Sequence, residues 1–387
     1  MSPVHLTNGH THSDTLQTES PPMETSPCSQ QSFKPLLKKL VETPEYFTSS
    51  DLRTALVHVF TPGLLSPEHI GAFLTALHIH RVERRPESLA AAASILRERA
   101  LKANVIDGDK DFVVDMVGTG GDGYNLFNVS TTAAIVAAGA GARVVKHGSR
   151  ASTSSSGSAD LLQALGVVFT PPSPPQSPGV PPTATPIPAI PFSFILAPHY
   201  HPALSYLAPY RKNLPFRTMF NVLGPLINPA SPRGMVLGVA EPELGRPFAE
   251  SLREGGVERA LVVCGYERLD EISCAGPTHA WELRDGKITE QALTPQLFGL
   301  EPHPLVKVVG GDPAQNAETF RQVLNSGKDV PQECKPVMDF ILMNASALLV
   351  VAGLAENYKD GVKIARDSIF EGKAWQAFET FKQSSAN

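Results

Sequence analysis

Between residues 33 and 107, apolar positions recur at the spacing of a helix. One predicted helix carries four apolar residues at i, i+3, i+4 and i+7 and so has a single apolar face: Ile70, Phe73, Leu74 and Leu77. Ser66–Glu68 predicts its start, because a hydroxyl residue can cap the first turn, proline suits the first position and an acid favours the positive end. The alanine-rich stretch 88–103 predicts a second helix. These patterns predict a small all-helical domain at residues 33–107.

From residue 111 onward, short apolar runs alternate with helical patterns. The runs that predict strands are Phe112–Val117, Ala142–Lys146, Arg233–Val239 and Leu261–Val263. The predicted helices are Thr131–Ala140, Ala159–Leu165, Asn344–Leu354 and Tyr358–Phe370. This alternation predicts an α/β fold, with a mostly parallel central sheet flanked by helices. We assign the large domain to residues 108–197 and 221–387, and helices from about 198–220 to the small domain.

Two segments do not fit either domain. Residues 1–32 are rich in Ser, Thr, Pro and His and offer little to bury, which predicts a disordered tail. Residues 171–191 contain many of the 35 prolines, and proline lacks the backbone N–H that a sheet needs. We interpret this second segment as an irregular insertion at the surface, with docking to a proline-binding partner as the alternative.

Composition narrows the class of protein. With 387 residues, of which 42% are hydrophobic, the chain can bury a sizeable core, and its net charge of −5 argues against general nucleic-acid binding. The four cysteines form no CxxC pair, which argues against a zinc site and favours a reducing compartment. Residues 1–33 contain no Lys or Arg, and we expect no apolar stretch as long as a membrane span. These features predict a cytoplasmic protein without membrane or nucleic-acid partners.

The densest chemical signal is the segment Gly118–Gly123, which reads GTGGDG and follows a predicted strand. Glycines let a backbone approach a phosphate closely, and the exposed N–H groups of such a loop can bind anions. The segment also satisfies GxGxxG, but a dinucleotide fold would begin its helix inside the motif and place an acid about 20 residues later. Here Tyr124–Phe127 precedes the helix, and the next strand ends in Lys146. The loop therefore predicts a phosphate site of another kind, and an oxidoreductase is not supported.

Four further segments extend this site. Asn128–Thr131 begins a predicted helix, where small polar residues either cap the helix or bind an anion together with its N–H groups. Lys146–Arg150 ends the second strand, at the edge where α/β folds bind ligands, and the Ser/Gly run Ser152–Ser158 opens into the next helix. Asp270-Glu271 follows a predicted strand, and such a pair is either solvated or a ligand of Mg²⁺ beside a phosphate.

In order and spacing, these segments resemble the anthranilate phosphoribosyltransferase family, in which GTGGD, NxST, KHGxR and SGSAD recur. Pyrimidine nucleoside phosphorylases share a looser version and remain the alternative. A later block, from His201 through Tyr210-Arg211-Lys212 to Arg217–Pro229, is similar to the anthranilate enzymes. The resemblance runs from about residue 33 to 385. It implies transfer of a 5-phosphoribosyl group from phosphoribosyl pyrophosphate to the anthranilate amine in tryptophan biosynthesis, with Mg²⁺ as cofactor and a homodimer as the assembly.

The resemblance also implies roles for individual residues. Those expected to hold phosphoribosyl pyrophosphate are Gly118, Gly121, Asp122, Asn128, Ser130, Thr131, Lys146 and Ser158. Those expected at anthranilate are Gly118, His147, Ser149, His201, Arg211 and Pro225, with Arg211 on the carboxylate. Those expected at magnesium are Ser130, Asp270 and Glu271. No general base is assigned, because an aromatic amine is already neutral at pH 7.

Two positions depart from the family pattern. Ser149 stands where asparagine is usual, and Leu126 stands where threonine is common. We expect both to change affinity without removing activity. A further alternative, a non-catalytic relative that binds nucleic acid, is disfavoured by the acidic net charge and the intact loops.

Overall fold

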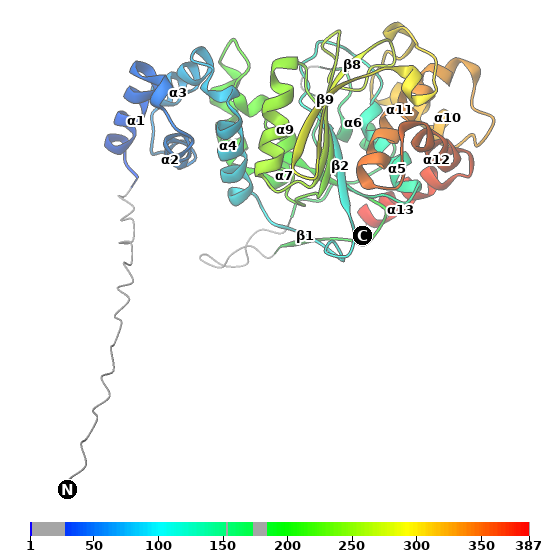
Figure 1. The fold of residues 1–387 in the computed structure, drawn as a ribbon, viewed down its shortest axis with the longest axis horizontal. Coiled ribbons are helices and arrows are strands. Elements are labelled where there is room, and N and C mark those ends of the chain that lie inside the picture. Colours follow the sequence, from blue (N-terminus) through cyan, green and yellow to red (C-terminus); the bar gives the residue numbers. More distant parts are fainter. Residues whose placement is uncertain (2–27, 152–153, 173–183, 387) are drawn as a thin grey trace.

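The structure is a computed structural model, and it describes Met1 and residues 28–151, 154–172 and 184–386. A helical part lies at one end of the molecule and a larger α/β part at the other (Figure 1). This agrees with the predicted fold class of a small all-helical domain joined to a large α/β domain.

The helical part contains four helices from the beginning of the chain: α1 (Gln30–Glu42), α2 (Ser49–Val59), α3 (Pro67–Ile79) and α4 (Pro86–Arg99). A fifth helix, α8 (Pro202–Lys212), comes from later in the chain and contacts α3 and α4. The apolar face predicted for α3 is buried, since Ile70, Phe73 and Leu77 have no exposed surface.

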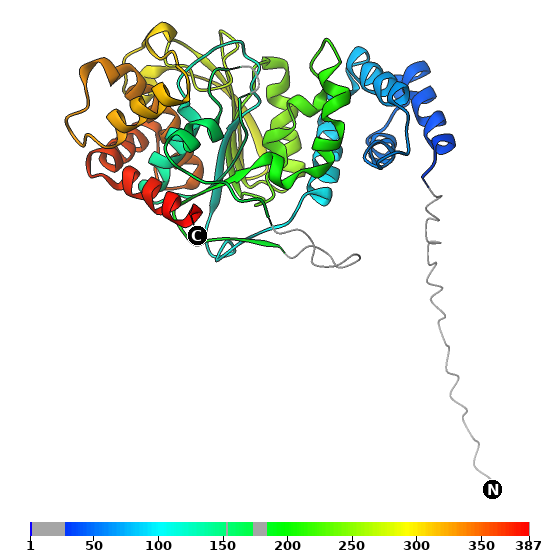
Figure 2. The same cartoon turned by 180° about the vertical axis from the view of Figure 1, so that it is seen from behind.

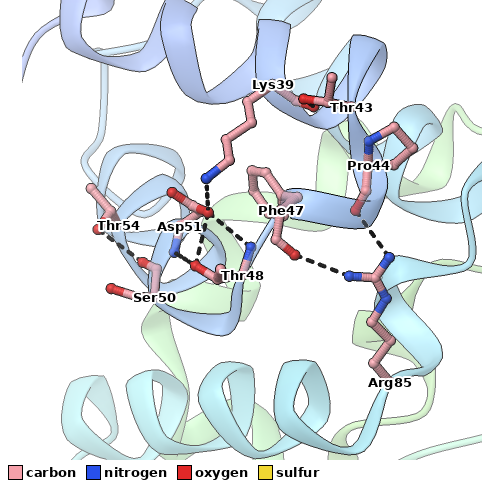
Figure 3. A network of polar contacts seen from close by, with 9 residues as sticks. All are labelled: Lys39, Thr43, Pro44, Phe47, Thr48, Ser50, Asp51, Thr54 and Arg85. Atoms are coloured by element: carbon pink, nitrogen blue, oxygen red, sulfur yellow. Dashed lines mark hydrogen bonds and ion pairs between the residues drawn. The ribbon is translucent and has the colours of Figure 1, made fainter.

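Side chains at the turns hold the first two helices together (Figure 3). Asp51 accepts hydrogen bonds from the Thr48 amide at 2.8 Å and from Lys39 Nζ at 2.7 Å, while the Thr48 hydroxyl accepts from the Asp51 amide. This reciprocal capping satisfies N–H groups that a helix start otherwise leaves unpaired. Arg85 donates to the carbonyls of Pro44 and Phe47, both at 3.0 Å, and so joins the start of α4 to the loop before α2.

The large part is built on a seven-stranded sheet with the order β5-β3-β2-β6-β7-β8-β9. Its five parallel strands are β5 (Phe192–Leu196), β3 (Arg143–Gly148), β2 (Val113–Gly118), β6 (Gly234–Gly238) and β7 (Arg259–Gly265). A hairpin of β8 (Thr278–Arg284) and β9 (Lys287–Leu293) continues the sheet in antiparallel fashion.

Alternate residues of β6 and β7 pack into two separate cores. Val236 and Leu261 face a core that includes α5 (Val129–Gly139) and α11 (Lys335–Ala352). Met235 and Val262 face the other side, where α9 (Gly245–Glu254) and the helical part share one core. The side chains of a strand point alternately to the two faces of a sheet, so the helical domain is packed directly onto one of these faces.

The remaining helices complete the layers. On the face of α5 the structure places α6 (Ser158–Ala164), α10 (Pro313–Leu324), α12 (Tyr358–Phe370) and α13 (Lys373–Ser385). The view from behind shows α13 and the chain end beside this layer, far from the helical part (Figure 2). The short α7 (Ala197–Tyr200) joins β5 to α8.

Several local predictions were wrong. The helix predicted for residues 88–103 ends at Arg99, and residues Ala103–Val105 form β1, which pairs in parallel with β4 (Thr185–Ile187). The proline-rich segment therefore contributes a strand, and its residues 173–183 lie outside the described part. Proline is tolerated here because β4 is one of only two strands in this small sheet and is thus an edge strand. The sequence reading also missed β5.

Three other predictions need correction. Ser66 precedes α3 as expected, but its hydroxyl contacts His69 Nδ1 at 3.0 Å and makes no capping bond. The predicted tail falls mainly on residues 2–27, outside the described residues, whereas 30–32 already belong to α1 because Ser29 and Ser32 cap it. One described helix, Gln332–Ala352, has the length and apolar composition of a membrane span, contrary to expectation, and 83% of its most apolar window is buried in the core.

Candidate functional site

The predicted site residues follow the carboxyl ends of β2, β3 and β7. In the parallel sheet Gly118 of β2 pairs with Gly238 of β6, and Gly148 ends β3 on the other side of β2. The connection after β2 leads to β3 on one side, whereas the connection after β6 leads to β7 on the other, and crevices in α/β folds form where the direction reverses in this way. This topology brings the glycine loop, Lys146 and the acid pair to one edge of the sheet.

Glycines shape the loop after β2. Gly120, Gly121 and Gly123 have φ angles of +67°, +85° and +83°, a region that side chains disfavour. Gly118 serves another purpose, because a Cβ atom there would overlap the Asp270 carboxylate. Asp270 Oδ2 also accepts the Gly120 amide at 2.6 Å, so the acid pair and the glycine loop form one unit.

The acid pair is crowded by negative charge. Burial, and then the neighbouring Asp122, raise the pKa of Asp270 to about 7. Burial and Asp270 also raise the pKa of Glu271 well above its usual range, whereas Lys146 and a hydrogen bond from Ser130 oppose this. A divalent cation would relieve this repulsion, so the donor set fits Mg²⁺. Among the described residues no group of three or more His, Cys, Asp or Glu side chains could hold a metal alone, and Mg²⁺ commonly takes its remaining ligands from phosphate and water.

Lys146 is the buried cation of the site. It is 1% exposed, and its Nζ donates to the carbonyl of Met116 and lies 3.4 Å from the Ser130 hydroxyl. Burial lowers its pKa, while Asp115, Glu271 and Asp270 act in the opposite sense. Its ammonium thus lies at the start of α5, near the backbone of β2 and the acid pair.

The start of α5 contains one unpartnered hydroxyl. Thr131 Oγ1 is buried and has no hydrogen-bond partner in the described part of the chain, which makes it available to a ligand. Asn128 precedes the helix, but its side chain does not cap it. Instead it donates to the Ser156 carbonyl at 2.8 Å and accepts from Ser156 Oγ and from Asn316 Nδ2. Asn128 therefore ties the Ser/Gly segment to the site.

The segment after β3 returns toward this cluster. The Ser149 carbonyl accepts the Ala159 amide at 3.1 Å, and Ser158 is the first residue of α6. Asp160 accepts from the amides of Gly157 and Ala151, which closes the loop between them. Residues 152–153 of the predicted Ser/Gly run lie outside the described residues.

Two buried histidines form a directed chain. His147 Nδ1 lies 3.1 Å from the carbonyl of Gly224, the residue before Pro225, and its Nε2 lies 3.2 Å from His201 Nε2. The carbonyl can only accept, so His147 carries its proton on Nδ1 and accepts from His201 Nε2. Burial lowers the pKa of His147 to about 3 and that of His201 to about 4. Both rings are therefore neutral at pH 7.

Arg211 approaches from the helical part. It lies in the last turn of α8, and its guanidinium carbon is 5.9 Å from the centre of the Phe220 ring. Its Nε atom is buried and has no hydrogen-bond partner among the residues that the structure describes. No hydrogen bond joins Arg211 to the glycine loop within the described ranges.

Leu126, which stands where threonine is common in the family, pairs through its backbone with Val309 and packs against the core on the α5 side.

Three residues that complete the site were not predicted from the sequence. Asp115 is fully buried in β2 and accepts from Asn228 Nδ2 at 2.9 Å and from the His147 amide at 3.3 Å. Arg217 donates to the Gly120 carbonyl at 2.9 Å. Asn228 and Arg217 belong to the block that carried the resemblance, and an acid inside an apolar strand run was the available signal for Asp115.

Comparison with known proteins agrees with this geometry. Residues 34–100 match a model described as the helical bundle domain of a glycosyl transferase family, and residues 110–375 match its a/b domain. An anthranilate phosphoribosyltransferase from Schizosaccharomyces pombe is 43% identical over 84% of this chain and 90% of its own length.

Two solved structures are similar to this chain over most of its length. The enzyme from Saccharomyces cerevisiae in complex with PRPP and Mg has a TM-score of 0.81 and 34% identity, covering 93% of this chain and 99% of its own. A second structure of that enzyme, with 4-fluoroanthranilate, has a TM-score of 0.79 and 32% identity over the same shares.

Proposed function

Because the chain belongs to the anthranilate phosphoribosyltransferase family, we propose that the crevice at the ends of β2, β3 and β7 is its active site. The chain transfers the 5-phosphoribosyl group of phosphoribosyl pyrophosphate to the amine of anthranilate, giving N-(5-phosphoribosyl)anthranilate and pyrophosphate in tryptophan biosynthesis. The observation that carries the assignment of the site is the convergence of the glycine loop, the buried Lys146 and the carboxyl pair Asp270-Glu271.

The phosphoribosyl pyrophosphate lies along the glycine loop and the start of α5. Gly118, Gly121 and Asp122 supply the loop, and the side chains that follow are Asn128, Ser130, Thr131, Lys146 and Ser158. The unpartnered Thr131 hydroxyl and the buried ammonium of Lys146 support this placement, because both gain a partner when a phosphate binds. Asn128 contributes chiefly by holding Ser156 in place.

Magnesium is held by Ser130, Asp270 and Glu271, two carboxylates and a hydroxyl that lie beside the phosphate loop. When bound, the cation offsets the charge that develops on the departing pyrophosphate. The raised pKa of Asp270, about 7, supports this role, since a buried carboxyl without a cation resists ionisation.

Anthranilate lies between the two domains, with its carboxylate on Arg211. The buried, unpartnered Nε of this residue supports the pairing, because a guanidinium fork matches a carboxylate. His147, His201 and Pro225 form the wall against the aromatic ring, with Gly118 and Ser149 at its edges. The two imidazoles stay neutral, so they add no positive charge where a cationic ribose carbon develops. Catalysis then rests on positioning and on electrostatic stabilisation of the leaving group.

Anthranilate fluorescence tests the function directly. Mixed with phosphoribosyl pyrophosphate and Mg²⁺, the protein should remove the emission, and Asp270→Asn should not. Phosphorolysis of thymidine or uridine, with no loss of anthranilate emission, would instead establish the nucleoside phosphorylase activity and refute the proposal.

We propose that the protein is a cytoplasmic homodimer. Three large apolar side chains of the helical part, Val41, Tyr46 and Ile79, are 50%, 67% and 66% exposed, and we propose that they belong to the interface. Cys264, Cys274 and Cys334 are buried free thiols, as suits a reducing compartment. Analytical ultracentrifugation should find a dimer that Tyr46→Glu with Ile79→Glu converts to a monomer, and fractionation should recover the protein with cytosolic markers.

A further inference from the structure

Arg217 binds the phosphate loop from the side of the helical domain. Its Nη1 donates to the Gly120 carbonyl at 2.9 Å, and its Nη2 lies 3.3 Å from the Thr119 carbonyl and 3.4 Å from that of Asn221. A guanidinium is a rigid planar fork, so it fixes these carbonyls relative to one another. A lysine in its place would supply the charge without this geometry.

Arg217 and Asp270 hold opposite edges of the same peptide group. The carbonyl of Thr119 accepts from Arg217, while the amide of Gly120, in the same peptide plane, donates to Asp270 Oδ2 at 2.6 Å. In a trans peptide the carbonyl and the N–H point in opposite directions. The next carbonyl, of Gly120, is also held by Arg217, so the Gly121 N–H is directed away from the guanidinium. The loop thus has a set orientation before any ligand arrives.

Packing at Gly121 also indicates that Arg217 and the loop hold a fixed arrangement. A Cβ atom at this position would lie within a bond length of Arg217 Nη1. The φ angle of +85° adds a second reason for glycine. Any side chain at residue 121 would therefore displace the guanidinium from the loop.

The segment that carries Arg217 is anchored in the helical domain. Phe216 stacks on His78 of α3 with ring centres 4.5 Å apart, and the Met219 amide donates to Glu83 Oε2 at 2.8 Å. Glu83 Oε1 in turn lies 2.8 Å from His78 Nδ1. The same segment follows directly after α8, the helix of Arg211. One short stretch of chain therefore joins the proposed anthranilate contact to the phosphate loop.

We infer that Arg217 is a positioning residue, which orients the Thr119–Gly121 peptides so that the amide of Gly121 can receive a phosphate group, while the amides of Thr119 and Gly120 donate to Gly238 and Asp270. The inference rests on the proposed function, because it assumes that the loop binds the phosphates of phosphoribosyl pyrophosphate. Arg217 itself is exposed. Its loss should consequently leave the fold intact and act on binding.

Calorimetry with phosphoribosyl pyrophosphate and Mg²⁺ tests this role in the full-length protein. Arg217→Ala should raise the Kd on the order of tenfold or more, since a hydrogen-bonding charged group is lost. Arg217→Lys should recover little of the affinity. Added methylguanidinium should restore binding to Arg217→Ala and leave the wild type unchanged. Arg246→Ala is the matched control, because Arg246 is also exposed and also bridges two acceptors, Glu250 and Glu290.

A double-mutant comparison adds a second test. Gly121→Ala should weaken phosphoribosyl pyrophosphate binding, and in that background Arg217→Ala should change the Kd by less than about twofold, because the guanidinium has already been displaced. Additive effects would overturn the inference.

The outcomes separate this inference from the proposed function. If the wild type gives no metal-dependent heat with phosphoribosyl pyrophosphate, the proposed function fails and the inference fails with it. If the wild type binds and Arg217→Ala binds equally well, only the inference fails. A loss in Arg217→Ala that methylguanidinium does not restore, or that Arg217→Lys fully repairs, would also refute the geometric role.

Discussion

Replacement of Arg211 by methionine should weaken anthranilate binding without destabilising the protein. The guanidinium is largely withdrawn from water at the end of α8, which lowers the pKa of Arg211, and its Nε has no hydrogen-bond partner among the described residues. A buried donor without a partner costs stability, and methionine keeps most of the apolar stem. The melting temperature of Arg211→Met should therefore equal or exceed that of the wild type.

The effect on the substrate should have the opposite sign. A hydrogen bond to a charged group contributes about 1.5–3 kcal/mol, so the KM for anthranilate should rise about 10- to 150-fold. The KM for phosphoribosyl pyrophosphate should stay within about twofold, because Arg211 makes no hydrogen bond to the glycine loop in the described residues. Steady-state kinetics on anthranilate fluorescence and differential scanning calorimetry provide the two measurements.

Lys212→Met is the matched control, since Lys212 is the next residue of the same helix and is exposed. It should leave both quantities unchanged. An unaltered KM in Arg211→Met would refute the assignment of the carboxylate partner. A fall in melting temperature of several degrees would refute the argument that the buried Nε atom of Arg211 is an unpaired donor.

The other predictions concern the acid pair, His201 and the hydrogen bond between Asn228 and the buried Asp115. Asp270→Asn should lower kcat at least on the order of 100-fold, with no recovery at high Mg²⁺, because an amide is a poor magnesium ligand. Full activity of this variant in stopped-flow or steady-state assays would exclude Asp270 as a magnesium ligand. The pKa of His201, about 4 in the folded protein, lies below its unfolded value, so its contribution to stability is present above about pH 6.5 and is lost as the pH falls toward 4. Between pH 7 and pH 5 the wild type should thus lose more melting temperature than His201→Gln, and equal losses would contradict the depressed pKa. Asn228→Leu removes the 2.9 Å donor to the buried Asp115 and should reduce the free energy of unfolding by about 1–3 kcal/mol in urea titrations, whereas an unchanged midpoint would argue against the network.

Much of the fold was accessible from local patterns. The helix predicted at Tyr358–Phe370 has the bounds of α12, and the strand predicted at Phe112–Val117 is displaced from β2 by one residue. Apolar periodicity reports which side chains are buried, so it succeeds where an element has one consistent environment. It failed at β1 and β4, two short strands that each contain an exposed residue. In β4 that residue is Pro186, and each strand is extended because it pairs with the other.

The candidate site divides in the same way. The sequence indicated a phosphate site and identified the family from three features in a fixed order: glycines, a lysine after a strand and a pair of acids. These features are informative because close approach of the backbone to a phosphate restricts the type of residue. The sequence could also list Gly118 and Gly121, but for one reason only, the approach of a ligand. In the structure Gly118 makes room for Asp270, and Gly121 makes room for Arg217.

From the sequence alone one could determine the class of fold, the family and the set of residue types around the substrates. Only the tertiary structure decided that Arg217 and Asp270 hold the two edges of one peptide, that His201 donates to His147, and that Asp115 accepts from the His147 amide. These contacts join residues between 32 and 150 positions apart. Local sequence patterns record spacing along one element, whereas such contacts depend on which strands are neighbours in the sheet and on how the helical domain packs against it.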